Sequence, residues 1–554
     1  MPTSSATPGP RSVAWMGWSL LGLGFLALAW LLPVNVKSLN PALLREAGRD
    51  TRSVSAFGRD LLEVDRPGPA ALALAAARTV GDPGAGRLET EYADFLQHHR
   101  DMAPWGGWDV ALEPLLIGRN AASPAESLPV LKFLVTQQAR DTLRMYLAVS
   151  RLPGVQALLR TGDLTTTKRF VPAHRPGGQP LDAVILLTSY LWQTEHLSPS
   201  LQREVRVLAE AAAGSGQIGA LEDFYLDILT LGKRLNWVQL SELLRTTTST
   251  ATVAQFAHLT RVAPEHLAVI YTAALMTRSA DGVARYLIAF GKPGAENLRQ
   301  AMAFGQGAVE QLVQRQVPLT SRSGMEFEIG AAFALRHPEL AVIAKYAAFL
   351  GGIFLLLRSV DLRMFAAIET ALPAAFPRMG SGLLAAILTF IFLVFSEPFL
   401  LKAAASADYQ IRLVIPVLGQ AVAAPAAKTS TTAPAMETST LLSILTFACL
   451  QIGMYVVCLL KISDVARQPL GPAVKLRLME NEENLFDGGL YIGIAGTATA
   501  LVLQVLGVIE ANLLAAYSSN LFGIVCVALV KIRHVRPYKR KLILEAQPAA
   551  PAAA

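Results

Sequence analysis

Apolar stretches long enough to cross a bilayer occur at both ends of the chain and enclose a long region with an amphipathic pattern. A membrane-spanning helix needs about 20 consecutive apolar residues, because each residue adds about 1.5 Å toward crossing a hydrocarbon core about 30 Å thick. By this criterion the pattern predicts about six spans. They lie at 13–33, 341–357, 380–401 and 438–460, with two more within 488–532.

The first apolar stretch, 13–33, is either an uncleaved anchor or a cleaved signal peptide. Trp15, Trp18 and Trp30 lie near its ends, and tryptophan is enriched at membrane–water interfaces. The stretch is long for a signal peptide, and the Pro- and Ser-rich residues 1–12 before it contain a single basic residue. We therefore expect an anchor that stays in the mature protein and follows a disordered tail.

The region 38–340 is predicted to be a soluble helical domain. Its apolar residues recur at three- and four-residue spacing, which is the helical period, and alternating strand patterns are scarce. Short amphipathic segments such as 237–247, 280–291 and 294–305 follow one another with brief breaks, as in an irregular stack of helical hairpins. The expected fold is therefore all-α, with multi-pass membrane helices and a large helical-hairpin domain inserted after the first span.

Basic residues are concentrated at 358–378, 461–477 and 531–541, which the positive-inside rule assigns to the cytoplasm. The loop 402–437 is longer and has only Lys402, Arg412 and Lys428 as basic residues, and it contains an Ala-, Pro- and Thr-rich stretch. We therefore expect a flexible external segment. Both termini are then cytoplasmic, and the inserted domain is periplasmic if the membrane is a bacterial inner membrane. The predicted organisation is a disordered tail at 1–12, an anchor at 13–33, a soluble domain at 38–340, two membrane helices within 341–401, an external loop at 402–437, a three-helix domain at 438–545 and a disordered tail at 546–554.

The composition agrees with a membrane protein. Of the 554 residues, 52% are hydrophobic and 16% are charged, whereas soluble domains average about 25% charged residues. Much of the net charge of +7 comes from the basic tail at 531–541. A basic cluster directly after an apolar helix favours an anionic lipid surface over a nucleic acid, so we expect the membrane and no nucleic acid as a partner.

The sequence contains no motif for metal binding, cofactor binding or nucleophilic catalysis. The three cysteines, Cys449, Cys458 and Cys526, all lie in apolar stretches, which argues against a disulfide framework and a thiolate zinc site. The histidines form no HExxH motif, and no phosphate-binding GxxxxGK[ST] loop occurs. We therefore expect no metal, no cofactor and no enzyme active site.

The last two apolar stretches contain small and polar residues that a lipid-facing helix does not need. Small residues let helix backbones approach closely, and polar groups at bilayer depth are costly unless they face other helices or water. Ordinary packing of membrane helices accounts for the same residues without an ion path. The candidates for close packing are Gly493, Gly496 and Gly523, and the candidates for a polar seam or ion path are Thr497, Thr499, Ser518, Ser519 and Asn520.

Glu510 lies at the predicted outer turn between these two stretches. It is either a terminal carboxylate that faces water or an outer entrance for protons or cations. Glu397, at the outer end of the predicted third span, has the same two interpretations, with the water-facing one favoured. Lys345, one turn into the second span, is expected to extend its ammonium group to the outer interface.

An acidic amphipathic segment at 478–487 leads into the step Gly496-Thr497, and the next helix places Ser519 and Asn520 before Gly523 and a basic exit. This order of motifs resembles the last two helices of the MotA/TolQ/ExbB proton-channel family, in which threonine usually occupies the positions of Ser519 and Asn520. The stretch 438–460 matches the first core helix of that family. Its inward direction agrees with the charge pattern.

The resemblance implies a homo-oligomeric ring, pentameric in that family, around single-span partners whose aspartate titrates while polar ring residues line its path. The last three helices contain no central acidic residue, so a titrating group would have to come from such a partner. The inserted domain is then expected to bind a periplasmic protein. An envelope scaffold whose spans only anchor and oligomerise is the alternative, and a transporter would need broken helices with charged residues at mid-membrane, which are not seen.

Overall fold

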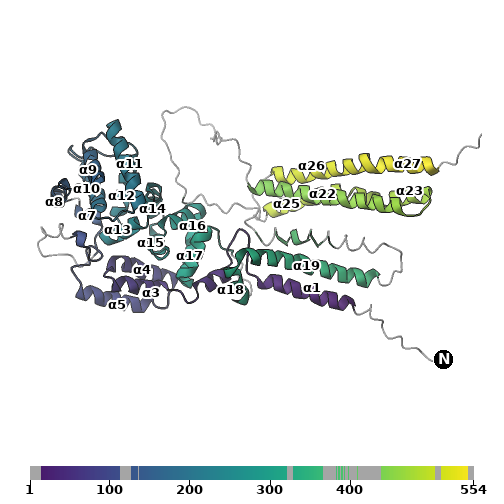
Figure 1. Cartoon of the computed structure of the whole chain (residues 1–554), viewed down its shortest axis with the longest axis horizontal. Coiled ribbons are helices and arrows are strands. Elements are labelled where there is room, and N and C mark those ends of the chain that lie inside the picture. The colour runs from purple at the N-terminus through teal and green to yellow at the C-terminus, as the bar shows by residue number, and fades with distance from the viewer. Residues whose placement is uncertain are drawn as a thin grey trace, which may run out of the picture. The chain divides into compact units, whose positions relative to one another are not determined.

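The computed structural model describes residues 14–112, 127–134, 136–320, 328–365, 438–505 and 513–546, with isolated positions between 382 and 409. All regular elements within these residues are helices (Figure 1). Pairing of β type is limited there to two isolated bridges, Leu39–Leu319 and Thr165–Gln217. The prediction of an all-α fold is therefore confirmed.

The chain forms two compact units, each with a buried apolar cluster of its own, around Leu88 in one and around Phe486 in the other. We call them the inserted unit and the flanking unit. The inserted unit consists of Leu39–Arg336 with Ala404–Pro416, and the flanking unit consists of Met1–Ser38, His337–Ala403 and Val417–Ala554.

Helices of about two to four turns make up most of the inserted unit, as expected for a stack of helical hairpins. In chain order they are α2 (Pro41–Gly48), α3 (Val54–Glu63), α4 (Pro67–Val80), α5 (Ala85–His98), η2 (Val110–Leu112), α7 (Val130–Leu134), α8 (Gln137–Ala148), α9 (Pro153–Arg160), η3 (Thr161–Asp163), α10 (Gln179–Gln193), α11 (Pro199–Ser215), α12 (Ala220–Gly232), α13 (Trp237–Arg245), α14 (Thr250–Val262), η4 (Pro264–His266), α15 (Leu267–Thr277), α16 (Ala280–Phe304), α17 (Gln306–Arg315) and α18 (Glu328–Arg336).

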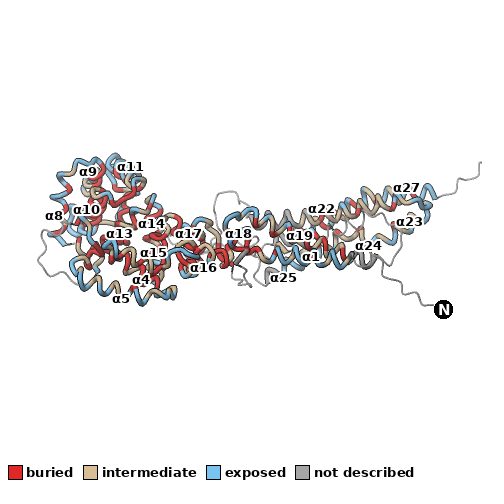
Figure 2. The backbone as a smooth tube through the Cα atoms, turned by 60° about the horizontal axis from the view of Figure 1, so that its bottom comes forward, coloured by how far each residue is buried: buried red, intermediate tan, exposed pale blue. Residues whose placement is uncertain are grey.

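The core of the inserted unit is built around two helices that are buried on nearly every side (Figure 2). Every residue from Leu181 to Trp192 of α10 is buried, and so is every residue from Val269 to Met276 of α15. Helices that are apolar on all faces belong in a core. By contrast, α8 and α11 each have one apolar stripe and cover the core from outside.

Local sequence signals set the ends of several of these helices. Asn236 caps α13 with a capping box. Its side-chain oxygen accepts from the backbone N–H of Gln239, and the Gln239 side-chain oxygen accepts from the backbone N–H of Asn236. The helix α16 bends at Gly291, where φ is 56° and ψ is −140°, a conformation that favours glycine. This bend separates the predicted segments 280–291 and 294–305.

A buried carboxylate holds one irregular segment of the inserted unit in place. Glu222, in the first turn of α12, is fully buried and accepts hydrogen bonds from the backbone N–H groups of Thr167 (2.8 Å), Arg169 (3.2 Å) and Phe170 (3.0 Å). The Thr167 hydroxyl donates to the same carboxylate. Buried backbone groups outside regular structure need such partners, so Glu222 takes the place of a neighbouring strand or helix.

The helices of the flanking unit include the longest described ones, α19 (Pro338–Phe365) with 28 residues and α22 (Thr438–Arg467) with 30. In chain order the helices of this unit are α1 (Ala14–Leu31), α19 (Pro338–Phe365), α22 (Thr438–Arg467), α23 (Pro472–Asn481), α24 (Glu483–Phe486), α25 (Gly488–Val505), α26 (Leu513–Ala528), the π-helical turn η5 (Leu529–Val535) and α27 (Arg536–Ala546). The helix α1 packs along α19 through a glycine pair, because a Cβ on Gly22 would lie 2.9 Å from the carbonyl oxygen of Gly352.

One helix in the described part of the chain, Pro338–Val360, is long and apolar enough to cross a membrane. The apolar helix Trp15–Leu31 is shorter. The expected number of about six spans is therefore not confirmed. The predicted span 380–401 and loop 402–437 lie almost wholly outside the described residues, although Tyr409 of that loop is buried and belongs to the inserted unit.

Candidate functional site

The predicted close-packing residues lie where α25 meets α26. A Cβ on Gly493 would lie 3.0 Å from the carbonyl oxygen of Ser519 and 3.2 Å from the Cα of Asn520. A Cβ on Gly523 would lie 2.6 Å from the carbonyl oxygen of Gly489. Any larger residue would force the two backbones apart, so glycine is what permits this approach.

The helix α22 joins this pair through Gln451, whose side chain is 4% exposed. Its Nε2 donates to the carbonyl oxygen of Gly489 at 3.0 Å. The Sγ of Cys526 in α26 lies 3.5 Å from the carbonyl oxygen of Gln451. Gln451 therefore contacts both partner helices, and we call the polar groups shared by α22, α25 and α26 the polar seam.

Two predicted seam hydroxyls donate to one acceptor, the carbonyl oxygen of Gly493. Ser519 is fully buried and donates across from α26 at 3.2 Å, and Thr497 is half-buried and donates within α25 at 3.0 Å. A Cβ on Gly496 would collide with the Ser519 hydroxyl, so this glycine makes room for it. Each of these two hydroxyl groups thus donates to an acceptor within a single copy of the chain.

Two amide oxygens of the seam have no donor. Oε1 of Gln451 and Oδ1 of Asn520 are buried and accept no hydrogen bond from any residue that the structure describes. Leaving a buried acceptor unsatisfied costs about 1–3 kcal/mol, so such groups need a reason to persist. The polar seam is therefore complete in its hydroxyl donors but open at two acceptors.

The structure brings Thr497, Ser519 and Asn520 together around Gly493 but places Thr499 on the exposed face of α25. Ser518 belongs to α26, but its side chain lies outside the described residues, as does Glu510. Gln451 was missed at the sequence level. The signal for it was a lone amide inside the apolar stretch 438–460, which is costly in lipid without a partner.

Opposite charges pair at the end of the flanking unit that contains the predicted cytoplasmic segments. Lys531 lies 2.7 Å from Asp487, and Lys461 lies 3.0 Å from Glu482. Tyr455 and His534 are joined by a 2.8 Å hydrogen bond. The acidic segment 478–487 therefore neutralises lysines of α22 and η5 and fastens the helix ends to one another.

The expectation that Glu397 faces water is wrong. Its side chain is fully buried and accepts hydrogen bonds from the N–H of Val36 (2.6 Å) and the hydroxyl of Tyr346 (2.9 Å). Lys345 is also buried and donates to the carbonyl oxygen of Val34 at 2.5 Å, so it does not extend freely to an interface. The physical reason is that the chain leaves α1 at 32–37, and its backbone groups there need side-chain partners.

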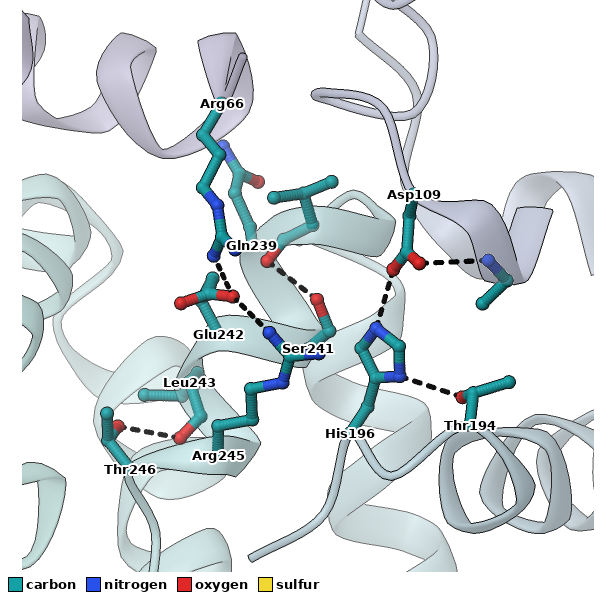
Figure 3. Close-up of polar contacts among 12 residues, drawn as sticks. Arg66, Asp109, Thr194, His196, Gln239, Ser241, Glu242, Leu243, Arg245 and Thr246 are labelled. Carbon is teal, nitrogen blue, oxygen red and sulfur yellow. Dashed lines mark hydrogen bonds and ion pairs between the residues drawn. The ribbon is translucent and has the colours of Figure 1, made fainter. Parts of the chain in front are cut away.

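A second buried polar cluster lies in the inserted unit. Nε2 of His196 lies 2.5 Å from Oδ2 of Asp109, and Nδ1 lies 2.8 Å from the Thr194 hydroxyl (Figure 3). The indole N–H of Trp237 donates to the same Asp109 oxygen at 2.8 Å. Burial alone would raise the pKa of Asp109, but these hydrogen bonds from His196 and Trp237 lower it to about 2.

The cluster contains the residue types of a catalytic triad of nucleophile, base and acid. Its contacts, however, fit a role in holding the fold together. The Thr194 hydroxyl donates its proton to the carbonyl oxygen of Tyr190 at 2.8 Å, and His196 is 2% exposed. The cluster therefore fastens the segment around Asp109 to α13. Beside it, Glu242 lies between Arg66 and Arg245 in a partly exposed ion-pair group (Figure 3).

Among the described residues, no group of three or more His, Cys, Asp or Glu side chains is placed to hold a metal ion. No protein-family model, curated protein or solved structure matches the chain. The resemblance to the MotA/TolQ/ExbB family therefore stays a prediction. Buried hydroxyls of α10 and α15, such as those of Ser189 and Thr272, also lack partners among the described residues. The polar seam is our candidate functional site because its two open amide oxygens lie on helices that the sequence predicts to span a membrane.

Proposed function

We propose that residues 438–545 form one subunit of a proton-conducting ring that transmits energy within the bacterial envelope. In this proposal the chain crosses the inner membrane about six times, both termini are cytoplasmic, and the inserted unit is periplasmic. The ring encloses a single-span partner that carries the titrating aspartate. The inserted unit binds a periplasmic protein on which the ring acts.

The observation that supports this proposal is the pair of unsatisfied amide oxygens, Gln451 Oε1 and Asn520 Oδ1. A protein that only anchors itself gains nothing from burying two acceptors without donors. A neighbouring copy, a protonated carboxyl group of a partner helix or water in a proton path would each supply the missing donor. The open acceptors lie beside Gly489 and Gly493, at which the backbone of α25 comes close to α26.

The second candidate is an anchored helical scaffold without ion conduction. It is favoured by the hydroxyls, because Ser519 and Thr497 both donate to Gly493 of the same chain and so serve packing. The two candidates differ in what the amide oxygens do. Only the ring requires donors that come from outside one protomer.

The variants Gln451→Leu and Asn520→Leu test this difference, because leucine has a similar volume and no acceptor. If the proposal holds, the full-length protein forms a closed ring of about five copies in detergent, as electron micrographs would show. Each variant should then stop proton flux in proteoliposomes that contain the ring and its single-span partner. In Asn520→Leu, relief of the unsatisfied oxygen should also stabilise the dissociated protomer by about 1–3 kcal/mol. Gln451→Leu also removes the Nε2 donor to the Gly489 carbonyl oxygen, so its protomer should gain less.

Leu521→Ala serves as the matched control, since Leu521 is adjacent to Asn520 and 60% exposed. It should leave both the ring and the flux unchanged. A monomeric or dimeric wild-type particle would contradict the proposal and favour the scaffold. Unchanged flux through a ring of Asn520→Leu subunits would contradict the role of the seam.

A further inference from the structure

We propose that the exposed face of α27 binds the phosphate-containing headgroup of anionic phospholipids in the membrane that the chain spans. This inference rests on the membrane topology of the proposed function but not on proton conduction. It assigns a ligand to arginines that the proposed ring does not use. The argument depends on which cations of the C-terminal segment already have acidic partners.

Two lysines near the end of the chain pair with acidic side chains. Lys531 pairs with Asp487, and Lys541 lies 3.7 Å from Glu545. Arg536 and Arg540 of α27 are exposed, and neither makes an ion pair or a hydrogen bond through its guanidinium with any described residue. These two guanidinium groups are therefore available to an external anion.

The packing of α27 decides which of its faces is free. Leu542 of α27 and Val535 just before it are buried against Val465 of α22 and Met479 of α23. On a helix, residues four apart lie on one face, so Arg536, Arg540 and Leu544 form a single stripe. That stripe lines a shallow pocket together with Pro537, Lys541 and Glu545. The Glu545 carboxylate pairs with Lys541, so the two arginines remain the unpaired charges of the pocket among the described residues.

The chemistry of this pocket fits a lipid headgroup better than a free anion. Guanidinium groups bind phosphate oxygens through paired N–H donors, so two arginines one turn apart suit one phosphodiester. Leu544 is 61% exposed and Ile543 is 48% exposed. Apolar side chains beside the arginines give the glycerol and acyl portion of a lipid a surface that inorganic phosphate would not use.

The position of α27 along the chain agrees with this ligand. The helix α26 continues through the π-helical turn η5 directly into α27, so α27 begins where the apolar segment ends. Side chains on a helix tilt toward its N-terminus, which for α27 is the end that joins the apolar helix. Arg536 and Arg540 therefore lean back toward the depth of the headgroups.

Native mass spectrometry of the full-length protein in detergent tests the proposal. The protein is titrated with phosphatidylglycerol or with phosphatidylcholine of the same acyl chains, and the bound fraction is measured. We expect a preference for phosphatidylglycerol that Arg536→Ala/Arg540→Ala weakens about thirty-fold, or about 2 kcal/mol at about 1 kcal/mol per cation. The control Arg467→Ala/Arg477→Ala removes two other exposed arginines of the same unit and should bind as the wild type does.

Three results would overturn the proposal. Equal binding of both lipids would show no selection for anionic headgroups, and an equal loss in the control pair would show that only net charge matters. Displacement of the lipid by millimolar inorganic phosphate would identify a general anion site. Because subunit number is read in the same spectra and proton flux is measured separately, failure here is distinguishable from failure of the proposed ring.

Discussion

The inserted unit and the polar seam of the flanking unit satisfy their polar groups in different ways. In the inserted unit, carboxyl groups such as those of Glu222 and Asp109 each accept several hydrogen bonds. In the seam, neutral hydroxyl and amide groups donate hydrogen bonds to the main-chain oxygens of Gly489 and Gly493. The difference teaches that the core of the inserted unit uses acidic side chains to organise irregular backbone, whereas the apolar helices of the seam depend on the close backbone approach that glycine makes possible.

The largest effect is expected from Glu222→Leu, which removes the acceptor of the backbone donors at Thr167, Arg169 and Phe170. Each buried donor left without a partner costs about 1–3 kcal/mol, so we expect a loss of about 4 kcal/mol in the free energy of unfolding. Urea denaturation of the full-length protein, followed by circular dichroism, measures it. The adjacent Asp223 is 60% exposed on its side chain, and Asp223→Ala should cost less than about 1 kcal/mol. Equal losses would show that charge near Arg169, rather than the buried clamp, holds the segment.

The next effect tests the glycine contact of the seam. Gly493→Leu should separate α25 from α26, because even a Cβ would lie 3.0 Å from the carbonyl oxygen of Ser519. Overpacking of this kind costs about 3 kcal/mol, which thermal unfolding in detergent would show as a lower Tm. Ala495 lies two residues away on the exposed face of α25, and Ala495→Leu should leave Tm unchanged. An unchanged Tm in Gly493→Leu would mean that the seam is not closely packed.

The third effect is that the stability of the inserted unit depends on pH because of Asp109. Its pKa falls from 3.8 to about 2 in the folded state, so the folded state binds its proton less readily than the unfolded state. The stabilisation, about 2 kcal/mol, is present above pH 4 and is lost as pH falls toward 2. Asp109→Asn should therefore be less stable than the wild type at pH 5, and the difference should shrink in acid, as urea midpoints across this range would show. A constant difference would contradict the role of the carboxylate charge, and Asp94→Asn, at a side chain that is 71% exposed, serves as the control.

The smallest effect is expected from Ser519→Ala. The hydroxyl donates to Gly493, but that oxygen also accepts from Thr497, so no buried acceptor is left unpaired. Side-chain hydrogen bonds between membrane helices contribute about 0.6 kcal/mol on average, and we expect a loss of that size in detergent unfolding. A loss above about 2 kcal/mol would show that seam hydroxyls matter as much as the carboxylates of the inserted unit.

The sequence predicted features that depend on neighbours along the chain. The helical period predicted α13 and the two halves of α16, and the break between them lies at Gly291, whose positive φ favours glycine. The amphipathic pattern likewise indicated an all-α fold. Such features are local because capping, periodicity and positive φ involve only a few consecutive residues.

Contacts between distant residues could not be predicted in this way. Asp109 and His196 are separated by 87 positions, and Gln451 and Gly489 by 38. The hydroxyls of the seam were predictable as a set, but which of them would be paired and which amide oxygens would be open depends on how three helices face one another. Glu397 was misjudged for the same reason, since its partners lie on α19 and in the segment after α1.

The contact between Glu397 and Val36 has a consequence for biosynthesis. The two residues are separated by 361 positions, so the ribosome releases the backbone N–H of Val36 long before it adds the carboxylate that accepts from it. At about 5–20 residues per second this interval lasts from about 20 seconds to more than a minute. During that time water or a chaperone must accept the hydrogen bond of this N–H group. The nascent chain therefore acquires its native conformation around Val36 only after most of the polypeptide has been translated.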